Sequence, residues 1–76
     1  MPETPPQILK LDPYKYREEI KSLASRMRVG EKILLIIDLR SHNIINNVIR
    51  VCRENNLSVI DGYDREKEII LVAVKR

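Results

Sequence analysis

The feature that most constrains this chain is an uninterrupted apolar run at residues 33–37, which reads Ile-Leu-Leu-Ile-Ile. A short continuous run rich in β-branched residues is typical of a strand buried at the centre of a sheet. It is too short to cross a membrane. A second run of the same kind occupies residues 69–74. The two runs therefore predict the central pair of strands in one sheet.

A first helix is predicted over residues 13–28. Asp12 can cap its start, because proline suits the first helical position and Pro13 follows directly. Gly30 is expected to end the helix before the strand at residue 32 begins. Its apolar residues recur at helical spacing and form one core-facing stripe: Tyr16, Ile20, Leu23, Ala24 and Met27.

A second helix is predicted from His42 to Asn55 or Asn56, with Ser41 as its N-cap. The two asparagines are expected to end it, since Asn tolerates the left-handed conformation better than most residues. The expected buried stripe is Ile45, Val48, Ile49 and Cys52, widened by Ile44 and Val51.

Two more strands complete the expected order β-α-β-α-β-β: residues 7–11 and residues 57–63, the latter followed by a hairpin into residues 68–75. Helical crossovers make the first three strands parallel and place both helices on one face. The fold class is therefore α/β, an α+β two-layer sandwich with a four-stranded mixed sheet of order 1-2-4-3. Residues 1–6 are expected to be a disordered lead-in, and residues 7–76 a single domain.

This arrangement leaves one sheet face without helices, although both central strands are apolar on both faces. Two sets of alternating residues compete for that face, and the set that faces away from the helices is expected to form an apolar patch that binds a partner. The partner would be another protein or a second copy of the chain. The candidate face consists of Leu34, Ile36, Ile70, Val72 and Val74; the other set is Ile33, Leu35, Ile37, Ile69, Leu71 and Ala73.

The chain resembles the small sulfur-carrier proteins of the TusA/SirA-like family. The likeness lies in the element order, in the Arg-Val-Gly-Glu-Lys turn at residues 28–32 with the strand after it, and in residues 51–59. The family's Cys-Pro-x-Pro motif carries a persulfide at the start of the first helix, where the helix N-terminus stabilises a thiolate. Here that place reads Asp12-Pro13-Tyr14-Lys15, and a carboxylate cannot carry sulfane sulfur.

The resemblance and the missing cysteine together predict a non-catalytic TusA/SirA-like binding module that acts through protein contacts and is accessory to sulfur relay. Cys52 lies on the apolar stripe of the second helix, where a small buried hydrophobe is expected rather than a reactive thiol. One Cys with one His cannot form a structural zinc site. No metal or cofactor is therefore predicted.

An anion- or ligand-binding site is predicted where the two helices begin, because free backbone N–H groups there can hold a phosphate. An alternative is that Ser41 merely caps its helix and Arg40 pairs with Asp38 or Asp12. His42 could act as a base or be exposed and non-catalytic. The candidate residues are Asp12, Pro13, Tyr14, Lys15, Arg40, Ser41, His42 and Asn43.

A net charge of +3 and a pI near 9.2 are compatible with a nucleic-acid partner. The same element order occurs in nucleic-acid binders similar to the archaeal Alba proteins and to the C-terminal domain of a bacterial initiation factor, a likeness of topology alone. A nucleic-acid-binding domain that uses the helix N-termini and scattered Lys and Arg is therefore the alternative function. The polar, proline-rich start is not a signal-peptide pattern, so a cytoplasmic location without membrane contact is expected.

Overall fold

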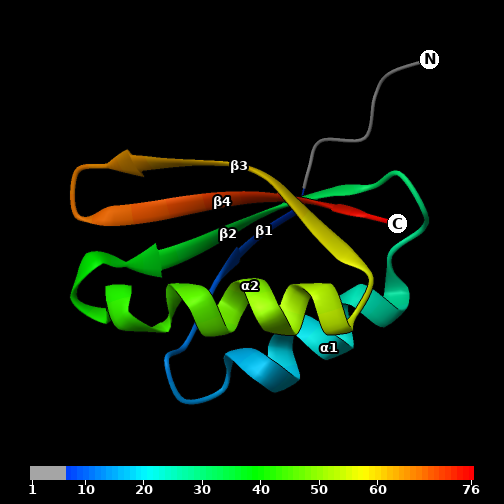
Figure 1. The fold of residues 1–76 in the computed structure, drawn as a ribbon, viewed down its shortest axis with the longest axis horizontal. Helices are drawn as coiled ribbons and strands as arrows, with labels where there is room; N and C mark the ends of the chain where they lie inside the picture. The colour runs from blue at the N-terminus through cyan, green and yellow to red at the C-terminus, as the bar shows by residue number, and fades with distance from the viewer. Residues whose placement is uncertain (1–6) are drawn as a thin grey trace.

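The computed structural model describes residues 7–76; the predicted lead-in at residues 1–6 lies outside them. The four strands form one mixed sheet of order β1-β2-β4-β3, and both helices lie on the same side of it (Figure 1). The predicted α+β fold and strand order are confirmed. Along the chain the elements are β1 (Gln7–Lys10), α1 (Tyr16–Arg26), β2 (Lys32–Asp38), the 3₁₀ segment η1 (Leu39–Ile44), α2 (Ile45–Glu54), β3 (Leu57–Arg65) and β4 (Glu68–Lys75).

The sheet is centred on β2 and β4, as the two apolar runs predict. β2 pairs antiparallel with β4 along its whole length, from Lys32 opposite Val74 to Asp38 opposite Glu68. β1 adds in parallel to the outer side of β2, and β3 adds antiparallel to the outer side of β4. Within residues 7–76, neither helix is long and apolar enough to cross a membrane.

Alternate residues of the central strands form the core with the two helices. Leu35 and Ala73 are fully buried at 0% exposure, and both belong to the set that faces α1 and α2. Fully burying an aliphatic side chain stabilises the fold by about 1.5–3 kcal/mol. The strand residues of this cluster are Ile33, Leu35, Ile37, Ile69, Leu71 and Ala73, and its most buried helix residues are Ile20, Ala24, Val48 and Cys52.

The start of α1 differs from the prediction. The helix begins at Tyr16, so the predicted start at Pro13 with Asp12 as its cap is wrong. The Asp12 carboxylate accepts the backbone N–H of Tyr14 at 2.7 Å, and its carbonyl accepts that of Lys15 at 3.1 Å. These bonds close a turn of the Asx type before the helix. The predicted stripe is confirmed, with Leu23 half-buried and the other four residues buried.

The end of α1 also differs, because the helix stops at Arg26 and Met27 is already extended. Gly30, expected to end the helix, lies instead in the following turn over residues 28–31. The Glu31 N–H donates to the Arg28 carbonyl at 3.0 Å, and Gly30 has a φ of +94°. A type II turn requires a positive φ at its third residue, which glycine adopts without strain.

The start of α2 also differs from the prediction. The helix begins at Ile45 rather than His42, because the 3₁₀ segment η1 comes first. Asp38 caps η1, since its carboxylate accepts the Arg40 N–H at 2.9 Å, and α2 itself has no side-chain cap. The predicted cap, Ser41, lies inside η1 with φ −108° and ψ 25°. The predicted end is confirmed, with Asn56 in the left-handed conformation at φ 61°.

The buried stripe of α2 is shifted around the helix from the predicted one. Val48 and Cys52 are at its centre with no exposed surface, and Ile44 and Val51 are buried beside them. Ile45 and Ile49 are half-buried and pack against the edge of the core.

β3 runs to Arg65, two residues beyond the prediction, and contains a β-bulge at Ile60. Val59 lies opposite Ala73 and Asp61 opposite Val72, so Ile60 is an extra residue without a partner on β4. The bulge turns the remainder of β3 over by one residue. As a result Asp61 and Tyr63 lie on the same face as Ser58, away from the helices.

Replacing Leu35 with alanine is expected to lower the free energy of unfolding by about 2–5 kcal/mol, since the side chain is fully buried and a cavity would remain. Leu39→Ala removes the same atoms from a side chain that is 46% exposed, and should cost less than about 1 kcal/mol. Urea denaturation followed by circular dichroism measures both. Equal losses in the two variants would contradict the core described here.

Candidate functional site

The predicted site at the helix starts is partly assembled in the structure. β1 and β2 end at one edge of the sheet, where a surface depression of about 630 Å³ lies. Tyr14, Lys15, His42 and Asn43 are exposed and do not line it. Of the eight predicted residues, four are brought together at this depression: Asp12, Pro13, Arg40 and Ser41, beside Lys10, Leu11 and Asp38.

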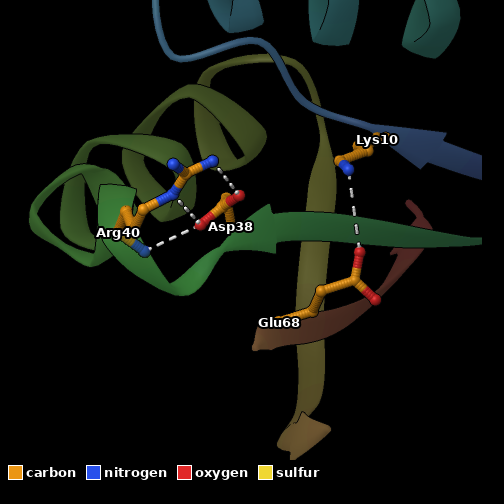
Figure 2. A network of polar contacts seen from close by, with 4 residues as sticks. All are labelled: Lys10, Asp38, Arg40 and Glu68. Carbon is orange, nitrogen blue, oxygen red and sulfur yellow. Dashed lines mark hydrogen bonds and ion pairs between the residues drawn. The ribbon is translucent and has the colours of Figure 1, made fainter. Parts of the chain in front are cut away.

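Arg40 is engaged by the neighbouring Asp38 (Figure 2). Its Nε lies 3.2 Å from Oδ1 and its Nη2 3.2 Å from Oδ2, while its backbone N–H also donates to Oδ1. The hydrogen bonds from Arg40 hold the pKa of Asp38 below its ordinary value, and the carboxylate raises the pKa of Arg40. The expected alternative in which Arg40 pairs with Asp38 is confirmed.

Several backbone N–H groups near the helix starts already have partners within the chain. Asp12 accepts from Tyr14 and Lys15, and Asp38 accepts from Arg40. The N–H of Leu39 donates to the Lys67 carbonyl at 2.8 Å. A phosphate that bound these donors would have to displace their present partners. Anion binding here stays a prediction.

His42 is exposed, and its Nδ1 lies 3.1 Å from the backbone carbonyl of Leu39. This contact fixes the orientation of the imidazole. A catalytic histidine of the triad type has a carboxylate that stabilises the imidazolium and a nucleophile that the ring activates. The contact with Leu39 provides neither.

Cys52 is fully buried in α2 against the core, as predicted. Burial without a compensating charge raises the pKa of its thiol to about 11, so the thiolate needed for sulfur chemistry does not form near neutral pH. Among residues 7–76, no group of three or more His, Cys, Asp and Glu side chains could hold a metal ion.

The sheet surface opposite α1 and α2, here called the open face, carries the other predicted set. Cross-strand partners share a face, and Leu34 pairs with Val72 and Ile36 with Ile70. All five predicted residues therefore lie on it. The pairing adds residues from the outer strands. The open face consists of Ile8 and Lys10 of β1; Lys32, Leu34, Ile36 and Asp38 of β2; Glu68, Ile70, Val72 and Val74 of β4; and Ser58, Asp61, Tyr63 and Arg65 of β3.

The apolar side chains of the open face are less exposed to solvent than the prediction of an apolar patch implied. Ile70 is only 3% exposed, although it lies outside the main core cluster, because Ile36 and Tyr63 flank it on the neighbouring strands. The other four predicted residues are half-buried. The most exposed apolar groups lie at the two edges, with Ile8 at 65% and Tyr63 at 47%. The open face is therefore aliphatic at its centre, with a more exposed apolar residue at each edge.

Charged side chains surround this aliphatic centre. Lys10 and Asp61 lie at its sides on the outer strands, and the charged residues at its ends are Asp38, Glu68 and Arg65 at one and Lys32 at the other. At one end the Lys10 Nζ reaches across β2 to a Glu68 carboxylate oxygen at 3.9 Å, close to the Asp38–Arg40 pair (Figure 2). Such a long, exposed pair contributes little to stability. At the other end Lys32 lies beside Val74, and within residues 7–76 it makes no ion pair.

Two features of the surface have no counterpart in the prediction. Tyr63 joins the open face only because of the bulge at Ile60, which interrupts the alternation on which the prediction relied. A second depression of about 300 Å³ lies at the end of α2, and Arg53, Asn56 and Arg76 contribute its long polar side chains. Its residues come from α2, from the start of β3 and from the end of the chain after β4. Because these segments are separate in the sequence, helical or strand periodicity could not reveal it.

The Cys52 thiol is expected to resist modification in the folded protein. With a pKa of about 11, about one thiol in a thousand is ionised at pH 8, and burial blocks the reagent as well. Reaction with a chromogenic disulfide reagent should be slow in buffer and rapid in guanidinium chloride. Rapid stoichiometric labelling of the folded protein would contradict a purely structural role.

The contact of Asp38 with Arg40 is expected to stabilise the folded protein at neutral pH and not in acid. Its pKa is lowered in the folded state, so its stabilising effect is present above the ordinary value of 3.8 and is lost as the pH falls through the folded value. Wild type should therefore melt higher than Asp38→Asn at neutral pH, and the difference should vanish in acid. Asp64→Asn, at an exposed carboxylate, is the control. A difference that stays constant between neutral and acid pH would contradict the pairing with Arg40.

Comparisons of the chain with protein-family models, with curated proteins and with solved structures gave no significant match. The function is therefore inferred from the residues and their geometry.

Proposed function

We propose that this protein is a small non-catalytic binding module that acts through protein contacts on its open face. The observation that carries the proposal is the meeting of apolar side chains from all four strands on the sheet surface opposite the helices. They are Ile8, Leu34, Ile36, Tyr63, Ile70, Val72 and Val74.

The composition of the open face supports this role. Its centre is aliphatic, one tyrosine lies at its edge, and its charged residues lie around the periphery. Protein interfaces have this organisation, with a core depleted of charge, an enrichment of aromatic residues and a polar rim. Apolar side chains that face water do not stabilise a monomer. A contiguous apolar patch is therefore typical of a surface that binds a partner.

The chemistry of the remaining candidates supports a non-catalytic role. Cys52 has a raised pKa in the core, and Asp12 stands where the TusA/SirA-like family has its sulfur-carrying cysteine. His42 contacts a backbone carbonyl rather than an acid or a nucleophile. An accessory role in sulfur relay belongs to the same proposal and rests on the sequence resemblance.

Nucleic-acid binding is the competing function, and salt discriminates between the two. Binding to phosphates releases counterions and weakens steeply as salt rises, whereas contact between apolar surfaces does not. The open face carries both charge signs: its basic residues are Lys10, Lys32 and Arg65, and its acidic residues are Asp38, Asp61 and Glu68. This mixture favours a protein partner over a polyanion.

Site-specific photocrosslinking in cells tests the proposal. Benzoylphenylalanine in place of Tyr63 should form protein adducts, since Tyr63 lies at the edge of the open face. The same residue in place of Tyr14 is the matched control: Tyr14 is also a tyrosine and is more exposed, at 94% against 47%, but it lies in the turn before α1.

Protease-sensitive adducts from position 63 and few from position 14 are expected. Equal yields at the two positions, or adducts at position 63 that nuclease removes, would overturn the proposal.

A further inference from the structure

We propose that the depression at the end of α2 binds a small phosphate monoester, whose phosphate group is held by Arg53 and Arg76. The organic part of the ligand lies against the apolar side chains beside them. The volume of about 300 Å³ is at the lower end of the range for small-molecule sites. This inference concerns a second surface and does not depend on the proposed function of the open face.

Three segments that are distant in the sequence form this depression. The end of α2 leads directly into β3, and the Arg76 N–H donates to the Asn56 carbonyl at 2.8 Å, which holds the residue after β4 beside them (Figure 1). The lining is polar on one side and apolar on the other. The polar residues are Arg53, Asn56, Ser58 and Arg76, and the apolar ones are Ile49, Leu57 and Val59.

Two guanidinium groups reach the depression from different elements. Arg53 lies in the last turn of α2, and Arg76 follows β4 and donates from Nη2 to the Ser58 Oγ at 3.5 Å. Neither arginine belongs to the two ion pairs found among residues 7–76, and no acidic side chain lines the depression. Each guanidinium presents a planar fork of N–H groups that fits phosphate oxygens. Two of them suit the roughly two negative charges of a phosphate monoester.

The helix dipole explains the position of Arg53 but not that of Arg76. A basic side chain in the last turn of a helix is favoured by the partial negative charge of the free carbonyls there. In α2 several of these carbonyls already have donors. The Val51 carbonyl accepts the Asn55 Nδ2 at 2.8 Å, and the Asn55 carbonyl accepts the Lys75 Nζ at 3.4 Å. These donors also reduce the repulsion that the helix end would exert on an anion.

The edge of β3 adds backbone donors to the two arginines. The bond from the Arg76 N–H to the Asn56 carbonyl fixes the alternation of the ladder, so Ser58 is at a hydrogen-bonded position and Leu57 and Val59 are not. Because β3 lies at the edge of the sheet, the peptide groups of Leu57 and Val59 point away from β4. Their N–H groups can therefore donate to a phosphate oxygen.

The apolar side of the depression favours an organic phosphate over the free ion. Leu57 is only 3% exposed, and Ile49 and Val59 are half-buried against the same core. Their positions are fixed by this packing, and they form an apolar surface next to the arginines. An organic group on the phosphate would remove this surface from water, which inorganic phosphate cannot do.

Amide NMR titration of the full chain with phenyl phosphate, at constant ionic strength, tests the proposal. Shifts are expected at residues 56–59, with a dissociation constant of about 1 mM. Inorganic phosphate should shift the same amides and bind more weakly. Benzyl alcohol has the ring without the phosphate, and it should leave these amides unchanged.

Variants of single arginines identify the residues that hold the phosphate. Arg53→Gln and Arg76→Gln should each raise the dissociation constant for phenyl phosphate by about fivefold or more, because each removes charge-assisted hydrogen bonds. Arg50→Gln is the matched control. Arg50 is exposed about one turn earlier on α2 and does not line the depression, so its loss should leave the dissociation constant unchanged.

All three arginines are exposed, and circular dichroism of each variant verifies the fold. The absence of shifts at residues 56–59 would overturn the inference, as would equal effects of Arg50→Gln and Arg53→Gln, which would indicate general attraction to a basic protein. Shifts confined to residues 38–43 would also overturn it, because the anion would then bind at the helix starts. Equal shifts with benzyl alcohol would show that the phosphate contributes nothing.

Discussion

The pairing of β2 with β4 determines both the stability of this protein and the surface it offers. The two strands pair over the whole of β2, and both are apolar at nearly every position. Helices that follow right-handed crossovers can cover one side of such a pair. The set that contains Leu35 and Leu71 is buried under them, and the set that contains Leu34 and Val72 remains on the other side. The core and the open face are thus two results of the same alternation.

A second constraint acts where β1 and β2 end. Strands that end at one edge bring the starts of two helices together, and this geometry often creates an anion site. Here an aspartate precedes α1 and another precedes η1, and each carboxylate accepts one backbone N–H, that of Tyr14 or of Arg40. The arrangement stabilises the turns, and a phosphate bound to these two N–H groups would have to displace the carboxylates. The same carboxylate, Asp38, also lies at one end of the open face.

The sequence was sufficient for the parts of the fold that depend on long periodic patterns. The apolar runs in β2 and β4 determine the strand order, and the helical stripe of α1 faces the core as predicted. Helix starts were less predictable, since Asp12 and Ser41 are good caps by residue type but tertiary structure decides whether each is used. Asp38 caps η1 because β2 ends at this residue. A residue's general preference for the N-cap position does not show where the preceding strand ends.

The candidate face was predictable in its centre and not at its edges. Leu34, Ile36, Ile70, Val72 and Val74 follow from strict alternation, which holds throughout β2 and β4. Tyr63 does not, because the bulge at Ile60 inserts one residue that alternation cannot anticipate. The near-complete burial of Ile70 also depends on neighbours from two other strands, and these are adjacent only after folding.

The bulge has a consequence for how copies of the chain can assemble. Edge strands expose rows of unpaired N–H and C=O groups, which can add further strands without limit and build fibres. On β3, Ile60 interrupts that row, and at the opposite edge β1 is only four residues long. Neither edge is a good template for an added strand. The open face, rather than either edge, is therefore the surface on which we propose that a partner binds.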